Sequence, residues 1–83
     1  MAWNVYELLN EERREVFIGM TEKDVGAEFE LDSAVPPAPV RHWDFRRERV
    51  RAKAYKTGLT RHEAREVVRG YQPQTGWKLH REL

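Results

Sequence analysis

The sequence predicts a small α+β domain built as a three-stranded antiparallel sheet with flanking helices. Three observations support this fold class. Two strand-like segments, 3–9 and 15–20, flank a polar turn; a basic segment, 48–56, alternates like a third strand; and a capped amphipathic segment follows Thr60. With 83 residues, the chain has room for a single domain covering 1–83.

The first two strands are expected to form a hairpin. Residues 3–9 are mostly strand-compatible, and Val16-Phe17-Ile18 repeats that character after the polar stretch 10–13. Thr21-Glu22-Lys23-Asp24 then resembles a helix-capping pattern, and Gly26 limits the helix that follows to one or two turns.

The central part of the chain fits two structures. Apolar residues at every second position within 44–56 indicate a strand near 48–56, which we favour. A helical stripe in the same region predicts instead a helix over about 41–57, ended by Gly58, and this alternative stays open. The preceding segment 33–39 contains three of the four prolines and predicts a stiff connector.

The next element is a helix of about ten residues. It begins with the capping box Thr60-Arg61-His62-Glu63, and Gly70 and Pro73 mark its end. The expected buried face consists of Ala64, Val67, Val68 and Tyr71. The tail either adds a short strand or only places Trp77 on the core.

Composition limits the class of protein. Charged residues make up 35% of the chain and hydrophobic residues 40%, so the core must be thin. The chain has no cysteine, which excludes disulfides and thiolate metal sites. No apolar run approaches the roughly 20 residues of a membrane helix, and the first residues lack the layout of a signal peptide. We therefore expect a cytoplasmic protein that does not bind membranes.

Charge is divided unequally along the sequence. Residues 1–34 carry three basic and nine acidic side chains, a net charge of −6, whereas residues 35–83 carry twelve basic and five acidic side chains, a net charge of +7. Nine of these bases lie between Arg41 and Arg65. Such a basic half meets either nucleic-acid phosphates or the acidic hairpin of the same chain, and both interpretations stay open.

The basic segment predicts a nucleic-acid surface. If 48–56 is a strand, basic residues at alternate positions share one face about 6.6 Å apart, which roughly matches successive phosphates. Trp43 or Tyr55 would stack on the bases of a single strand. The predicted nucleic-acid-binding residues are Arg41, Trp43, Arg47, Arg49, Arg51 and Lys53. The alternative is a solvated face whose arginines pair with the chain's own carboxylates.

Other chemistries have no motif support. His42, His62 and His80 are too dispersed for a metal-ligand spacing, so no metal site is predicted. Ser33 is the only serine and has no apparent base beside it, and the glycines form no phosphate-binding loop.

Two short motifs carry a family resemblance. Asn4-Val5-Tyr6 is followed, after ten intervening residues, by Phe17-Ile18-Gly19 with Thr21 after it, and Gly58–Ala64 leads into the late helix. This order resembles the GIY-YIG nuclease family over about two-thirds of the chain. The resemblance implies phosphodiester hydrolysis with Mg²⁺ or Mn²⁺, carried out by a hairpin tyrosine, an arginine on the first helix and a glutamate on the late helix.

The chain supplies this set incompletely. Tyr6 matches the first motif's tyrosine and is the one predicted catalytic residue. The pattern is broken at Asn4, at Phe17, at the arginine position near Ala27 or Glu28, and at Val68. Val68 stands where the family has its metal-binding glutamate, and Glu66 lies about 200° round the helix from it.

Together these features predict a GIY-YIG-like domain that binds nucleic acid through a basic face without efficient cleavage. The alternative is a protein-interaction module that uses a sheet edge or forms a homodimer. A metal-dependent endonuclease is the third hypothesis, and it alone requires a cofactor.

Overall fold

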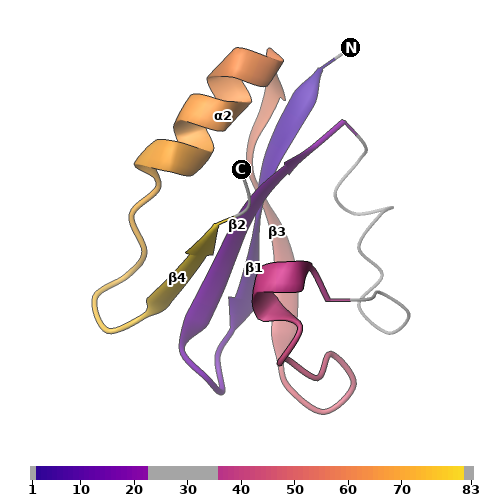
Figure 1. The fold of residues 1–83 in the computed structure, drawn as a ribbon, viewed down its shortest axis with the longest axis vertical. Coiled ribbons are helices and arrows are strands. Elements are labelled where there is room, and N and C mark those ends of the chain that lie inside the picture. Colours follow the sequence, from indigo (N-terminus) through magenta and orange to yellow (C-terminus); the bar gives the residue numbers. More distant parts are fainter. Residues whose placement is uncertain (1, 23–35, 82–83) are drawn as a thin grey trace.

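The structure of the chain is a computed structural model that describes residues 2–22 and 36–81. Its elements are β1 (Trp3–Asn10), β2 (Glu15–Thr21), η1 (a 3-10 turn, Ala38–Val40), β3 (Val50–Leu59), α2 (Arg61–Gly70) and β4 (Lys78–Arg81). The four strands form one sheet in the order β3-β1-β2-β4, and α2 packs against one face of it (Figure 1). The predicted α+β class is confirmed.

The predicted hairpin and third strand are both present. β1 pairs antiparallel with β2 on one side and with β3 on the other. The strand expected near 48–56 is Val50–Leu59, so the alternative helix over 41–57 is wrong. Pairing with β1 over most of its length satisfies the backbone of β3 on that side, which agrees with the strand that the alternation favoured.

Two parts of the predicted architecture need correction. The sheet is not three-stranded and antiparallel, because β4 pairs parallel with β2 and makes it a mixed four-stranded sheet. The tail does add a short strand, Lys78–Arg81, which is one of its two expected structures, but nothing in its sequence indicated parallel pairing with β2. The described residues contain a single α-helix, α2. The short helix expected after Thr21 lies outside the described residues, as do residues 33–35 of the connector, whereas 36–39 are described and lead into η1.

Helix α2 begins as the sequence predicts. The Glu63 N–H donates to Thr60 Oγ1 at 3.1 Å, and the Thr60 N–H donates to Glu63 Oε1 at 3.0 Å, which completes the capping box. Ala64 and Val68 are fully buried against the sheet. Across residues 2–22 and 36–81, no helix has the length and apolar character that crossing a bilayer would require.

The sheet separates two hydrophobic cores, because successive side chains of a strand point to opposite faces. The helix-side core contains Val5, Val16, Ile18, Ala64, Val68 and Tyr71. The loop-side core contains Tyr6, Leu8, Phe17, Val40, Trp43, Phe45 and Val50. In Figure 1, η1 and the chain after it lie on the side of the sheet away from α2. This irregular segment therefore serves as the second covering layer.

A buried polar contact joins the segment after η1 to the hairpin turn. Asn10 is fully buried; its Nδ2 donates to Glu48 Oε1 at 3.2 Å, and its Oδ1 accepts from the Arg13 N–H at 3.1 Å. Arg13 Nε also donates to Glu48 Oε2 at 2.5 Å. The buried amide is therefore satisfied by groups from both segments, and it holds them together.

Candidate functional site

The six predicted nucleic-acid-binding residues fall into two groups. Arg51 and Lys53 lie in β3, whereas Arg41, Trp43, Arg47 and Arg49 all precede that strand. The prediction that Arg47, Arg49, Arg51 and Lys53 share one face of a strand is therefore wrong for Arg47 and Arg49, which precede β3. Arg47 belongs to a turn in which its N–H donates to the Asp44 carbonyl at 3.2 Å, and Arg49 immediately precedes β3.

The structure also corrects the role of Trp43. Its side chain belongs to the loop-side core and is only 3% exposed, so it cannot stack on a nucleic-acid base in this conformation. Trp43 packs in this core with Val40 and Phe45, and burial of its large apolar surface stabilises the fold more than exposure to a ligand would. Tyr55, the other aromatic that the sequence offered, is 44% exposed on β3.

The register of β3 with β1 shows which basic residues share a face of the sheet. Residues directly opposite each other in an antiparallel pair project on the same side. Arg51 is opposite Leu9, Lys53 is opposite Glu7, and Lys56 is opposite Val5. Leu9 and Val5 belong to the helix side of the sheet, and Glu7 accepts a hydrogen bond from Tyr71 on that side. The Tyr55 ring also contacts Tyr71, with ring centroids 5.2 Å apart.

We call Arg51, Lys53, Tyr55 and Lys56 the basic strand surface. All four side chains are exposed on β3, which is an outer strand of the sheet. Arg51 Nη2 lies 2.5 Å from Glu11 Oε1, and this ion pair is largely exposed. Within the described part of the chain, Lys53 and Lys56 form no ion pair. The acidic hairpin thus neutralises the basic half only in part.

One buried carboxylate lies close to this surface. Glu7, opposite Lys53, is 9% exposed and accepts a hydrogen bond from the Tyr71 hydroxyl. Burial raises the pKa of Tyr71, and the hydrogen bond to Glu7 raises it further. The Tyr71 hydroxyl therefore stays protonated and fixes the side chain of Glu7, which lies opposite Lys53.

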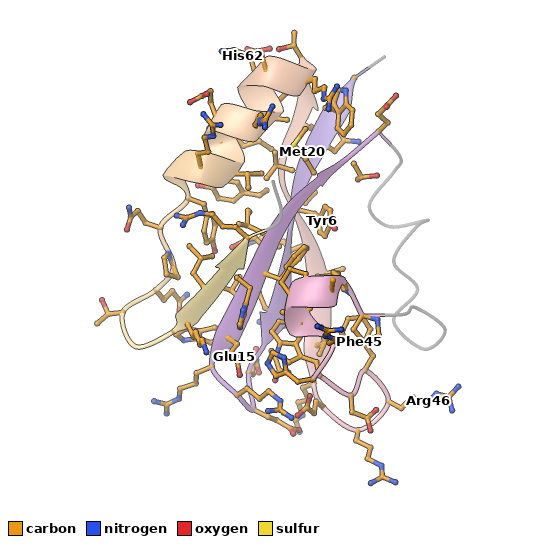
Figure 2. The ribbon with its side chains drawn as sticks, viewed as in Figure 1. Tyr6, Glu15, Met20, Phe45, Arg46 and His62 are labelled. Carbon is orange, nitrogen blue, oxygen red and sulfur yellow. The ribbon has the colours of Figure 1, made fainter. Side chains whose placement is uncertain are left out.

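The residues that the nuclease resemblance singles out do not form a catalytic site among the described residues. Tyr6 is 5% exposed, and its ring lies 5.9 Å from that of Phe17 inside the loop-side core (Figure 2). Val68 is fully buried. Glu66 is exposed, and its Oε1 lies 3.6 Å from Arg69 Nη1. The expected arginine position near 27–28 is outside the described residues.

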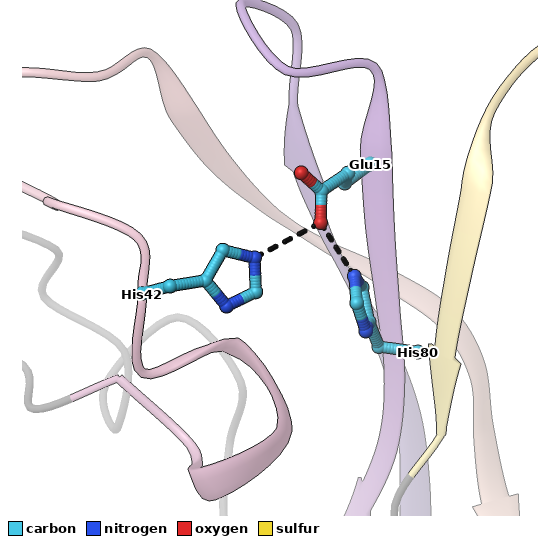
Figure 3. Close-up of side chains that lie close together, drawn as sticks. All are labelled: Glu15, His42 and His80. Atoms are coloured by element: carbon cyan, nitrogen blue, oxygen red, sulfur yellow. Dashed lines mark hydrogen bonds and ion pairs between the residues drawn. The ribbon is translucent and has the colours of Figure 1, made fainter.

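A second cluster was not predicted at all. Glu15, His42 and His80 come from three separate parts of the chain and meet on the loop side of the sheet (Figure 3). Glu15 begins β2, His80 lies in β4 opposite Phe17, and His42 follows η1. Nε2 of His80 is 2.6 Å from Glu15 Oε1, and Nε2 of His42 is 3.1 Å from the same oxygen.

The environment of this cluster keeps its carboxylate charged. The side chains of Glu15 and His80 are 13% and 12% exposed, and that of His42 is 44% exposed. Burial by itself raises the pKa of Glu15, but hydrogen bonds from His80, His42 and Trp43 outweigh it, and the net pKa is lowered. Two imidazoles facing an ionised carboxylate are a donor set that divalent transition metals use.

Sequence reasoning missed this cluster for a specific reason. His42 and His80 are 38 positions apart, and no spacing rule links a loop residue to a strand that forms only in the folded sheet. The alternation in Lys78-Leu79-His80-Arg81 would have placed His80 on the face opposite Leu79. Nothing in it indicated that β4 lies beside β2.

Comparison of the chain with protein-family models, curated protein sequences and solved structures found no match. Its function is therefore inferred from the residues and their geometry.

Proposed function

We propose that the chain is a GIY-YIG-like domain that binds the phosphate backbone of nucleic acid through its basic strand surface, without efficient cleavage. The observation that carries the proposal is the alignment of Arg51, Lys53 and Lys56 on one face of the outer strand β3. From the first to the last of these residues the strand covers about 17 Å, which is enough to contact two or three phosphates of one strand.

Two features suit this surface to a polyanion. Because an exposed ion pair contributes only about 0–1 kcal/mol, a phosphate can replace Glu11 as the partner of Arg51 at little cost. Tyr55 adds an exposed aromatic ring between Lys53 and Lys56. Such rings stack on unpaired nucleobases regardless of sequence. Arg49, exposed immediately before the strand, adds a further positive charge at its start.

Fluorescence anisotropy with labelled single- and double-stranded DNA, measured over a salt series, tests this function. Affinity should fall linearly with salt on logarithmic axes. Replacing Lys53 and Lys56 together with glutamine removes two phosphate contacts, so the slope should become shallower by about 1.8 for duplex and about 1.4 for single strands. Tyr55→Leu should weaken binding to single strands more than to duplex.

A matched variant separates local contact from total charge. Lys78→Gln combined with Arg65→Gln also removes two exposed positive charges, but Lys78 lies in β4 at the opposite edge of the sheet and Arg65 lies on α2. This variant should keep the salt slope of the parent chain. Equal losses in both double variants, or no binding even at low salt, would contradict the proposed surface.

Binding without cleavage agrees with the buried position of Tyr6 and with Val68 in place of an acidic ligand. Incubation of plasmid DNA with Mg²⁺ or Mn²⁺ tests this part separately. Nicking by the parent chain that disappears in a Tyr6→Phe variant would show that the domain is an active nuclease.

The exposed edge of β3 supports a second candidate, a protein-interaction module. β3 has ten residues, and within 2–22 and 36–81 its one neighbouring strand is β1, so its other edge offers backbone groups for pairing with a strand of another chain. Light scattering over a range of concentrations distinguishes the two: a dimer that persists in high salt favours strand pairing, because phosphate binding would be lost there.

A further inference from the structure

We propose that Glu15, His42 and His80 form a binding site for one divalent transition-metal ion, with Zn²⁺ as the best-fitting metal. One ligand atom from each residue lies within 4.8 Å of the others. This site lies on the loop side of the sheet, whereas the basic strand surface lies on the helix side, so it is separate from the proposed nucleic-acid contact.

The distances require little movement to admit a metal. At Zn–N and Zn–O distances of about 2.0–2.1 Å, two ligand atoms of a tetrahedral site are about 3.3 Å apart. The observed separations from Glu15 Oε1 are 2.6 Å to His80 Nε2 and 3.1 Å to His42 Nε2. Shifts of less than about 1 Å would open both contacts to the metal-bound spacing, and the two histidine nitrogens, which lie within 4.8 Å of each other, would close by up to about 1.5 Å.

The ligands are held by the fold and not only by one another. Glu15 and His80 sit in paired strands, and Glu15 Oε1 also lies 3.5 Å from Trp43 Nε1. His42 immediately precedes the buried Trp43, whose backbone N–H donates to the Val40 carbonyl at 2.9 Å. Arg13 Nη2 donates to the His42 carbonyl at 3.3 Å. The site is therefore largely pre-organised, which reduces the entropy lost on binding.

The donor set selects the kind of metal. Imidazole nitrogens favour Zn²⁺ and other late first-row ions, whereas Mg²⁺ and Ca²⁺ prefer sites made of oxygen atoms. Three protein ligands leave a fourth tetrahedral position, and the 44% exposure of the His42 side chain places that position near solvent. Water or an external ligand completes the coordination. The bound metal would join β2, β4 and the segment after η1.

Isothermal titration calorimetry of the chelator-treated chain with Zn²⁺ tests the site. We expect one Zn²⁺ per chain, a higher melting temperature in its presence, and no displacement by a large excess of Mg²⁺. His80→Ala and Glu15→Gln should each weaken binding by about 100-fold or more, since even partners that only support a ligand are worth 10–100-fold.

His62 supplies the matched control. It is the remaining histidine, exposed in the first turn of α2 at the far end of the molecule from Glu15 (Figure 2). His62→Ala should bind Zn²⁺ as tightly as the parent chain does. Equal weakening by His62→Ala and His80→Ala, or binding that His80→Ala leaves intact, would overturn the proposal.

A measurement on the unaltered chain guards against variants that fail to fold. In ¹H–¹⁵N spectra of the histidine rings, Zn²⁺ should shift the ring nitrogens of His42 and His80 and leave those of His62 unchanged. Rings that all stay unperturbed at saturating Zn²⁺ would show that the cluster is only a hydrogen-bond network.

Discussion

Replacement of Gly19 by alanine should destabilise the domain, because the added methyl group has no room. A Cβ at this position would lie 2.8 Å from Phe17 Cε1, 2.8 Å from the Tyr6 hydroxyl oxygen and 2.9 Å from Tyr6 Cζ. Both rings belong to the loop-side core, where Phe17 is fully buried and Tyr6 is 5% exposed. Neither ring can turn out to solvent, so the core itself must shift.

The size of the effect follows from two opposing contributions. Overpacking a well-filled core costs about 1–3 kcal/mol. Exchanging glycine for alanine in a strand returns about 0.5–1 kcal/mol, because the unfolded chain loses conformational freedom. The net loss in the free energy of unfolding should therefore lie between about 0 and 2.5 kcal/mol. A loss of 1 kcal/mol corresponds to a melting temperature lower by about 4–8 °C in a domain of this size.

Urea denaturation followed by tryptophan fluorescence measures the loss, and Gly70→Ala is the matched control. Gly70 ends α2, and a Cβ there would meet no atom within 4 Å, so this variant should be neutral or slightly stabilising. In a Tyr6→Phe background, Gly19→Ala should cost less, because one of its three close contacts is gone. Equal stabilities of Gly19→Ala and Gly70→Ala would refute the explanation by packing.

The remaining predictions concern a carboxylate and a helix cap. Burial raises the pKa of Glu48, but hydrogen bonds from the Asp44 N–H, Arg13 and Asn10 outweigh it and lower the net pKa below its ordinary value of 4.5. A lowered pKa in the folded state means that the ionised form stabilises the fold above pH 4.5, and that this contribution is lost as the pH falls through the folded-state value. Glu48→Gln should therefore be less stable than the parent chain at pH 7, and the difference should shrink as the pH falls below 4.5 and through the lowered pKa of Glu48; a constant difference in urea denaturation across this range would contradict this. Thr60→Ala should cost about 1 kcal/mol by the same assay, because it removes the acceptor for the Glu63 N–H at the start of α2, whereas Thr75→Ala, in an exposed turn, should change stability little.

The sequence by itself determined the elements whose signals are local. The polar turn between two strand-like segments predicted the hairpin, and the capping box predicted where α2 begins, because both depend on residues that contact near neighbours in the chain. Alternation also favoured the third strand, although its bounds differ from those predicted. The unequal distribution of charge between residues 1–34 and 35–83 was also visible in the sequence.

Only the tertiary structure decided which distant residues meet. The parallel pairing of β4 with β2, the burial of Trp43 and the convergence of Glu15, His42 and His80 all depend on contacts between segments far apart in sequence. Such contacts are selected by the total burial and hydrogen bonding of the whole domain, which no periodicity or spacing within one segment records. For the same reason, the basic side chains that face solvent together on β3 could be identified only from its register with β1.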